Sequence, residues 1–190
     1  MPLCRQAQWP RLKQDWKNYV TENGKTITQG EFAVSDRPGS MISTILGSCV
    51  ATCLWDDAAK VGGMNHILVA QTNIGGVLND FAGVNAMELL INGLVRRGAD
   101  RANLKAKVFG GAKMVSGLSD IGGKNGTFAL EFLKREGIEC LGYSLGGTSA
   151  RHIKFFPAEG RVMQKLVAAP ADIDRKPVAK APVQNDVELF

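Results

Sequence analysis

Short apolar runs separated by turn-forming residues make up most of the chain after residue 27. Runs of this kind, rich in β-branched and aromatic residues, are typical of β-strands. The pattern predicts strands at 28–34, 41–46, 50–55, 60–70, 104–109, 138–145, 151–156 and 161–167. The polar segment Asp56–Ala59 lies between two of these runs and predicts a hairpin that joins 50–55 to 60–70.

Two other segments carry apolar residues three and four positions apart, which is the spacing of one helix face. The first covers 80–97 and is followed by Gly98, a residue type that often ends helices. The second covers 127–136 and is followed by Gly137. The polar, glycine-containing segment 112–125 between them is predicted as a long loop.

The order of the predicted elements is strands, helix, strand, helix, strands. Hairpin-linked strands outnumber the helices, which is untypical of a doubly wound parallel sheet. We therefore expect an α/β fold: a layered α/β/α sandwich with a mixed, largely antiparallel sheet and two main helices. The pattern predicts one domain over 27–167. An N-terminal extension at 1–26 precedes it, and the tail at 168–190, rich in alanine, proline and mixed charge, is predicted to be disordered.

Composition excludes several classes of protein. No apolar run approaches the roughly 18 residues of a membrane span, and no signal-peptide pattern precedes the predicted domain. Four cysteines in 190 residues are few for a disulfide scaffold, so we expect a protein of the reducing cytoplasm. The net charge of +5 shows no clustered basic face, and we expect no nucleic-acid partner.

Cys49 and His66 are the candidate reactive pair. Cys49 follows the small residues Gly47 and Ser48, which leave room for a substrate and expose backbone N–H groups. A free thiol is mostly protonated at neutral pH, so a nucleophilic cysteine needs a base, and pairing of the predicted hairpin strands would bring His66 within side-chain reach. Unpaired cysteines are also common as small residues of the core. On residue chemistry alone, both interpretations stay open.

A metal site is a weaker interpretation of the same side chains. Cys49 and Cys53 would need His66, Cys140 or His152 to complete a zinc site. The two cysteines span an apolar run instead of the loop or knuckle of a structural zinc site, so we expect no metal. His152 lies in a predicted strand and is not expected to be a second catalytic base.

A series of segments in fixed order resembles the chemoreceptor glutamine deamidase (CheD) family over about residues 28–167. The segments are LGSCVATCLWD, KVGGMNHILV, AMELLINGLVRRGA, AKVFGGAKM, IGGKN, EGI and LGGTSARHIKF. The resemblance implies a cytoplasmic hydrolase of bacterial chemotaxis, a protein-glutamine glutaminase. Such an enzyme converts glutamines of methyl-accepting chemoreceptors to glutamate and releases ammonia, and the resemblance implies no cofactor.

The resemblance also implies roles for individual residues. It makes Cys49 the nucleophile and His66 its base. The family's third catalytic residue is a hydroxyl residue, typically threonine, six positions before the cysteine. This chain has Ser43 there and a threonine one position later, Thr44. Neighbouring side chains of a strand face opposite ways, so we expect Ser43 to be the catalytic hydroxyl.

Around this predicted triad we expect Thr44, Gly47 and Ser48 to contact the substrate. Backbone N–H groups near Ser48 and Cys49 would stabilise the oxyanion. The same residues would also hydrolyse a glutamyl methyl ester. For the receptor helix we expect a groove formed by 112–125 and Gly146-Gly147. The alternative is a non-catalytic module that regulates a CheC-type phosphatase, a known partner of the family.

Overall fold

The computed structural model describes Gln6 and residues 24–69, 72–74, 77–79, 81–114 and 120–167. Its strands are β1 (Gly24–Thr26), β2 (Phe32–Ser35), β3 (Met41–Leu46), β4 (Val50–Asp56), β5 (Val61–Asn65), β6 (Thr72–Ile74), β7 (Val77–Asn79), β8 (Lys105–Gly110), β9 (Glu139–Leu145), β10 (Ala150–Phe156) and β11 (Arg161–Val167). Its α-helices are α1 (Phe81–Val95) and α2 (Ile121–Arg135), and short 3-10 helices cover Arg101–Asn103 and Pro157–Glu159. The predicted tail at 168–190 and most of the predicted extension lie outside the described residues.

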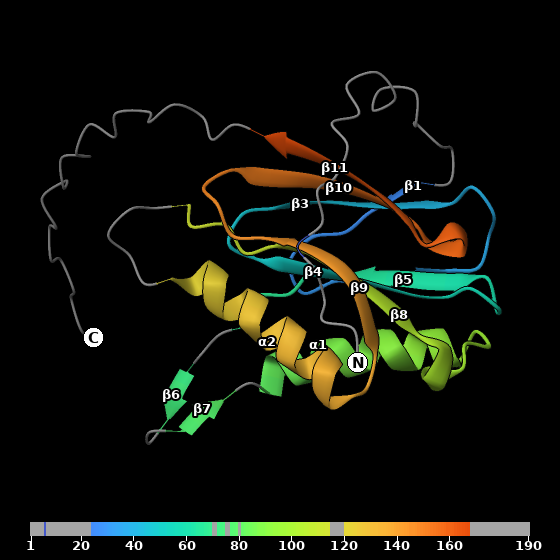
Figure 1. Ribbon diagram of the computed structural model, residues 1–190, viewed down its shortest axis with the longest axis horizontal. Helices are drawn as coiled ribbons and strands as arrows, with labels where there is room; N and C mark the ends of the chain where they lie inside the picture. Colours follow the sequence, from blue (N-terminus) through green and yellow to red (C-terminus); the bar gives the residue numbers. More distant parts are fainter. Residues whose placement is uncertain are drawn as a thin grey trace, which may run out of the picture.

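The main elements form three layers (Figure 1). The central layer is a mixed five-stranded sheet in the order β2-β5-β4-β8-β9, in which only β8 and β9 run parallel. A four-stranded sheet in the order β1-β3-β10-β11 covers one of its faces. Both helices cover the other face. The α/β class, the mixed sheet and the two main helices are confirmed, but the predicted α/β/α layering is wrong: the order is sheet, sheet, helices.

Strand β4 shows why this arrangement is stable, because all its residues are buried. Val50 and Leu54 face the helices and belong to the core beneath α1 and α2. Ala51, Cys53 and Trp55 alternate with them and belong to the second core, between the two sheets. Burial on both faces explains why the strand is mostly apolar, with Thr52 and Asp56 as its polar residues.

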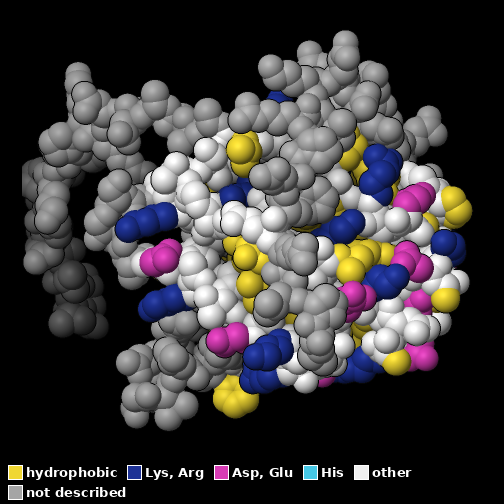
Figure 2. All heavy atoms as spheres, in the orientation of Figure 1, with side chains coloured by type: hydrophobic (Ala, Val, Ile, Leu, Met, Phe, Trp, Pro, Cys, Tyr) yellow, Lys and Arg dark blue, Asp and Glu magenta, His cyan; other side chains and the backbone are white. Residues whose placement is uncertain are grey.

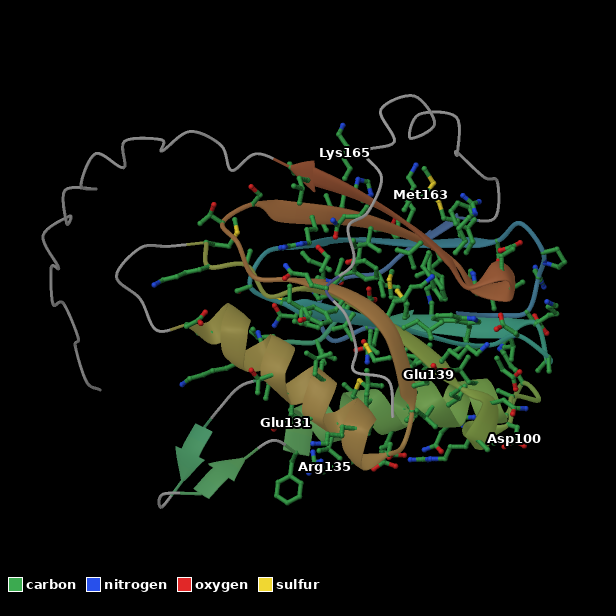
Figure 3. The ribbon with its side chains drawn as sticks, viewed as in Figure 1. Asp100, Glu131, Arg135, Glu139, Met163 and Lys165 are labelled. Carbon is green, nitrogen blue, oxygen red and sulfur yellow. The ribbon has the colours of Figure 1, made fainter. Side chains whose placement is uncertain are left out.

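Both outer layers carry charged side chains on their far sides, although Met41, Phe156 and Met163 form a buried cluster on the outer face of the four-stranded sheet. Lys165 of β11 points away from the other layers, and Glu131 and Arg135 lie on α2 at the opposite side of the molecule (Figure 3). Neither helix within the described residues is long and apolar enough to cross a membrane.

Several predicted elements are confirmed almost to the residue. The 41–46 strand is β3, the 80–97 helix contains α1, and the turn at Asp56–Ala59 joins β4 to β5 in an antiparallel hairpin. The predicted strand 28–34 is shorter, because Thr28–Glu31 folds into a closed turn before β2 begins. In that turn the Glu31 carboxylate accepts hydrogen bonds from the N–H and the hydroxyl of Thr28.

The predicted loop 112–125 is wrong at its C-terminal end, because α2 begins at Ile121. Asp120 caps the helix by accepting a hydrogen bond from the N–H of Gly123. Glycine has low helix propensity, so the sequence suggests a loop here. Gly122 has a packing role, because a Cβ at this position would overlap the carbonyl oxygen of Gly111. This contact brings the start of α2 against the segment that follows β8.

The core between the sheets can be tested with two isoleucines of β3. Ile42 is 2% exposed and packs between the sheets, whereas Ile45 is 60% exposed. We expect Ile42→Ala to lower the free energy of unfolding by about 2–5 kcal/mol, through lost burial and the cavity left behind. The matched variant Ile45→Ala should change it by about 0.5 kcal/mol or less. Urea unfolding measures both, and equal losses would contradict the layer order.

Candidate functional site

The turn Gly47–Cys49 joins β3 of one sheet to β4 of the other, and its carbonyl groups are all held. The oxygen of Gly47 accepts from the N–H of Ala112 at 2.9 Å, and that of Cys49 from the N–H of Gly111 at 2.8 Å. The oxygen of Ser48 accepts from Nδ2 of Asn125 at 2.8 Å. Among the described residues, no other residue accepts from the N–H of Ser48 or Cys49. The turn therefore has the free backbone donors that an oxyanion requires.

Gly110, the last residue of β8, lets the chain lie directly on this turn. Its φ of +114° is in the region that favours glycine, and a Cβ there would overlap the carbonyl oxygen of Cys49. The next residue, Gly111, then donates to the same carbonyl. The glycine pair after β8 is thus part of the frame that holds Cys49.

Cys49 and His66 lie on the same face of the five-stranded sheet, each one residue outside its strand. The antiparallel bridge between Val50 and Ile67, with hydrogen bonds of 2.9 and 2.8 Å, fixes the local register. In this register His66 is opposite Ala51, so Cys49 is its diagonal neighbour on the side facing the second sheet. Side chains at diagonal positions are within reach of each other when one of them is long or aromatic. The predicted juxtaposition of thiol and imidazole agrees with this register.

The backbone of His66 is held by the turn before β2. Its N–H donates to the carbonyl of Glu31 at 3.0 Å, and its carbonyl accepts from the N–H of Gly30 at 2.8 Å. The side chain is 6% exposed, at the edge of the core between the sheets. This placement leaves little freedom to the backbone that carries the ring.

Thr44 fixes the orientation of the imidazole. Its Oγ1 lies 2.8 Å from Nδ1 of His66 and also 2.8 Å from the carbonyl oxygen of Ile27. A carbonyl only accepts, so the hydroxyl donates its single proton in a hydrogen bond to Ile27, and its oxygen accepts a hydrogen bond from Nδ1–H of His66. The neutral ring is then protonated at Nδ1, and Nε2 keeps the lone pair of a base.

Ser43, which was expected to be the catalytic hydroxyl, does not contact the imidazole in the structure. In β3, Thr44 shares its face with Ile42 and Leu46, which pack between the sheets. Ser43 faces the other way, and its Oγ lies 3.0 Å from Oγ1 of Thr26. Thr44, expected to contact the substrate, is instead 1% exposed and bound to the ring.

Burial shifts the pKa of both reactive groups toward their neutral forms. Partial burial lowers the pKa of His66 below its ordinary value of 6.5, and the Ile27 carbonyl and the Glu31 carboxylate oppose this shift. Partial burial raises the pKa of the Cys49 thiol, while its own backbone N–H acts in the opposite direction. The resting pair is therefore a neutral thiol beside a neutral imidazole at neutral pH.

Two residues near Cys49 were not identified from the sequence. Oε1 of Gln29, an exposed residue of the Thr28–Glu31 turn, lies 3.6 Å from Sγ of Cys49. Asn125 binds Ser48 from α2 although it was assigned to a loop. Asn125 lies in the segment IGGKN, which belongs to the family resemblance, but only the three-dimensional packing shows which groups its side chain contacts.

The other candidate residues are not near a common centre. Cys53 is fully buried between the sheets, and burial strongly raises the pKa of its thiol. Cys140 and His152 lie on β9 and β10. Within the described part of the chain, no group of three or more His, Cys, Asp or Glu side chains is placed to hold a metal ion.

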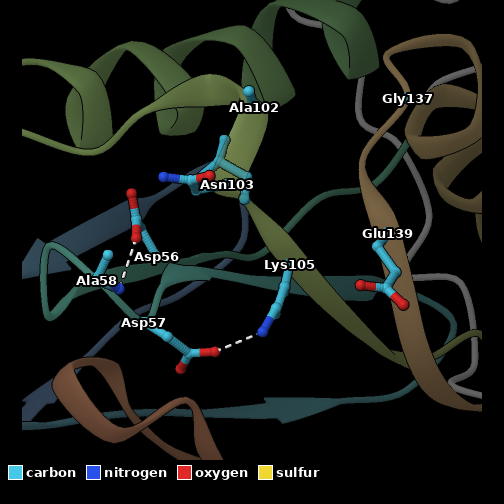
Figure 4. Close-up of a pocket in the computed structure, with 9 residues that line it drawn as sticks. Asp56, Asp57, Ala58, Ala102, Asn103, Lys105, Gly137 and Glu139 are labelled. Carbon is cyan, nitrogen blue, oxygen red and sulfur yellow. Dashed lines mark hydrogen bonds and ion pairs between the residues drawn. The ribbon is translucent and has the colours of Figure 1, made fainter.

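A hollow of about 350 Å³ lies at the far end of β4 from Cys49 (Figure 4). Two of its acidic side chains, Asp56 and Asp57, are already engaged. Asp57 pairs with Lys105 at 2.7 Å, and Asp56 accepts from the backbone N–H groups of Ala58 and Ala59. These contacts hold the β4–β5 turn, so Asp56 and Asp57 stabilise structure.

Charged side chains of both signs are interspersed on the face shown in Figure 2. Lysines and arginines do not form a continuous basic patch over the described residues of that face. Nucleic-acid binding would need such a patch to contact phosphates.

The state of His66 can be measured by NMR, since the chain has only two histidines. We expect His66 to titrate below pH 6.5, because burial disfavours the imidazolium. Long-range ¹H–¹⁵N spectra should show the proton of the neutral ring on Nδ1. Signals are assigned with His66→Gln and His152→Gln, and a neutral ring protonated at Nε2 would contradict the assigned hydrogen bonds.

The same shift predicts how stability depends on pH. The unfolded chain binds a proton at His66 more tightly than the folded chain, so the free energy of unfolding should fall as the pH falls through about 6.5. His66→Gln should reduce this acid-side loss. Urea unfolding at several pH values between neutral and mildly acidic measures this loss. The same pH dependence of the free energy of unfolding in the wild type and in His66→Gln would contradict the burial of this ring.

Comparison with known proteins indicates the family of this chain. The family model described as CheD chemotactic sensory transduction matches residues 80–166. The probable chemoreceptor glutamine deamidase CheD of Caulobacter sp. strain K31 is 49% identical over 172 residues, covering 86% of this chain and 91% of the relative. The probable chemoreceptor glutamine deamidase CheD 1 of Ruegeria sp. strain TM1040 is 45% identical over 184 residues, covering 90% and 98%. A crystal structure of a Neisseria meningitidis protein is similar at a TM-score of 0.40, with 14% identity over 66% of this chain and 62% of that one. Given the two relatives and their coverage, the chain belongs to the CheD family.

Proposed function

We propose that this chain deamidates glutamine side chains of chemoreceptors, the activity for which its relatives are named, and that Cys49 is the nucleophile. The observation that carries the proposal is the hydrogen bond between Thr44 and Nδ1 of His66. It leaves Nε2 as a base on the face of the sheet that Cys49 shares. A cysteine buried only as a small core residue would not need an oriented imidazole and free backbone donors beside it.

The proposed reaction follows acyl-transfer chemistry. Nε2 of His66 takes the thiol proton as Sγ of Cys49 attacks the side-chain amide carbon. The N–H groups at Ser48 and Cys49 stabilise the oxyanion of the tetrahedral intermediate. His66 returns the proton to the leaving nitrogen, and the carbon–nitrogen bond breaks to release ammonia. Water, activated by the same ring, then hydrolyses the thioester to give glutamate and the free thiol.

Gln29 supports an amide as the substrate. Its side chain brings the oxygen of a primary amide to 3.6 Å from Sγ of Cys49, so the entrance accommodates the end of a glutamine side chain. Gln29 is exposed and can move aside for an incoming substrate. A receptor glutamine would then enter from the solvent side of the Thr28–Glu31 turn.

The surface around Gly47 is the proposed contact for the receptor helix. Met114 is 39% exposed and borders Gly47. The N–H of Lys113 donates to the carbonyl of Gly147 at 2.8 Å, so the turn after β9 lies beside the same segment. Apolar and backbone groups at this rim suit one face of an amphipathic helix. Each deamidation would add a carboxylate to that helix and alter its packing electrostatics.

Two narrower statements rest on the same site. A glutamyl methyl ester has the same carbonyl with a better leaving group, so ester hydrolysis is proposed as a side activity of the pair. Binding to a CheC-type phosphatase is proposed as the alternative function, which would not need Cys49 to react.

Peptide mass spectrometry tests the nucleophile. The purified chain is incubated with receptor cytoplasmic fragments, and glutamine-containing peptides are followed for the amide-to-acid mass increase. We expect conversion by the wild-type chain and none by Cys49→Ala, because Cys53, the other free thiol of the described residues, is fully buried between the sheets. Cys53→Ala is the matched control and should remain active. No conversion by the wild type would leave the binding function, and equal conversion by Cys49→Ala would exclude Cys49 as nucleophile.

The two neighbouring hydroxyl residues can be separated by the same assay. Thr44→Val keeps the side-chain shape but cannot accept from Nδ1, so the ring loses its orientation. We expect kcat to fall by at least about tenfold, within the contribution typical of a positioned general base. Ser43→Ala should remain close to the wild type, since Ser43 contacts Thr26 on the other face. The reverse result would restore Ser43 as the catalytic hydroxyl.

A further inference from the structure

Asn125 stands out among the buried polar residues because it connects the two segments that carry Cys49 and His66. Its side chain is 0% exposed and projects from the first half of α2. Nδ2 donates to the carbonyl of Ser48 at 2.8 Å, and Oδ1 accepts from the N–H of Val69 at 3.0 Å. Ser48 directly precedes Cys49, and Val69 follows His66 by three residues. The carboxamide of Asn125 thus connects the segment at Ser48 to the segment at Val69.

The register shows what this carboxamide replaces. Val50 and Ile67 exchange both backbone hydrogen bonds, which makes them a hydrogen-bonded pair of the antiparallel ladder. The next hydrogen-bonded pair along the ladder is Ser48 with Val69, where the N–H of Val69 would ordinarily donate to the carbonyl of Ser48. Asn125 takes that place with its own acceptor and donor. The Asn125 side chain therefore separates the backbones at Ser48 and Val69, which would otherwise pair directly.

Asn125 sets the orientation of the Ser48–Cys49 peptide. Asn125 draws the Ser48 carbonyl toward α2, and the peptide bond to Cys49 is trans. In a trans peptide the N–H points opposite to the carbonyl, so the N–H of Cys49 is turned away from Asn125.

We propose that Asn125 is a positioning residue for the deamidation: it holds Ser48 out of the strand ladder so that the N–H of Cys49 faces the oxyanion that forms at the attacked carbon. This inference rests on the proposed function, in which Cys49 forms that carbon–sulfur bond. Asn125 touches neither the thiol nor the substrate amide and acts only through the Ser48–Cys49 peptide. Its carboxamide is suited to the place, because it both accepts and donates, as the missing backbone partners would.

The chain offers a matched control in Asn65, which is 1% exposed and belongs to the same hairpin. Its Oδ1 accepts from the N–H of Thr52 at 2.9 Å, and its Nδ2 donates to the carbonyl of Ala86 at 3.4 Å. Like Asn125, the buried Asn65 side chain therefore accepts a hydrogen bond from a backbone N–H of the sheet. It makes no contact with the Ser48–Cys49 peptide, so its replacement reports the cost of losing such a bond away from the oxyanion site.

The test compares Asn125→Asp with Asn65→Asp. Each variant keeps the acceptor for its backbone N–H and loses the donor to its carbonyl. Conversion of receptor fragments gives kcat and KM. Alkylation of Cys49 by iodoacetamide, measured at a pH where the thiol is fully ionised, gives the reactivity of the sulfur in a reaction that forms no oxyanion. Asn125→Ser, smaller and uncharged, is used if the buried carboxylate prevents folding, and thermal unfolding monitors all variants.

We expect Asn125→Asp to lower kcat about 10²-fold, the effect of losing one oxyanion donor, with little change in KM. Alkylation of Cys49 should stay near the wild-type rate. Asn65→Asp should lose comparable thermal stability but keep its kcat. Unchanged kcat in Asn125→Asp, or an equal fall of kcat and alkylation, would overturn the inference. A wild-type chain that converts no glutamine would instead refute the proposed function, and the inference with it.

Discussion

Two consecutive strands, β3 and β4, lie in different sheets, and the turn Gly47–Cys49 that joins them determines the geometry of the site. It places the thiol at the edge of the core between the sheets. Thr44 reaches this edge from one sheet and His66 from the other. Because each carbonyl of the turn is bound, by 111–112 or by Asn125, the backbone there cannot relax toward a regular strand. The relative positions of Cys49, Thr44 and His66 therefore depend on this one turn between the sheets.

The position of this turn also explains the charge state of Cys49 and His66. At the edge of the core, burial favours the neutral forms of both Cys49 and His66. Neither group is activated by a permanent neighbouring charge, and Glu31 only moderates the shift at His66. The thiolate would therefore form when the substrate is in place and the proton moves to His66. Such a thiol is less exposed to unwanted oxidation, which follows thiolate character and access.

Local patterns predicted the local structure well. The β4–β5 hairpin and α1 follow from short-range turn and helix signals, which act within a few residues. The start of α2 was missed because Gly122 and Gly123 read as a loop, whereas close packing on Gly111 requires a glycine there. The layer order was also missed. The apolar face of a helix indicates that the helix packs on a sheet, but it does not indicate on which face of the sheet. Here both helices pack on the same face.

The sequence by itself determined where a thiol and an imidazole occur and the order of segments that marks the family, because both depend on residue type along the chain. It favoured Ser43 over Thr44 from the spacing to the cysteine, but it could not show which of the two faces His66, since β3 carries apolar residues on both faces, Ile42 on one and Ile45 on the other. Only the packing of β3 on the second layer turned Thr44 toward His66. Gln29 and Asn125 likewise reach Cys49 and Ser48 from distant segments, through contacts that no local pattern encodes.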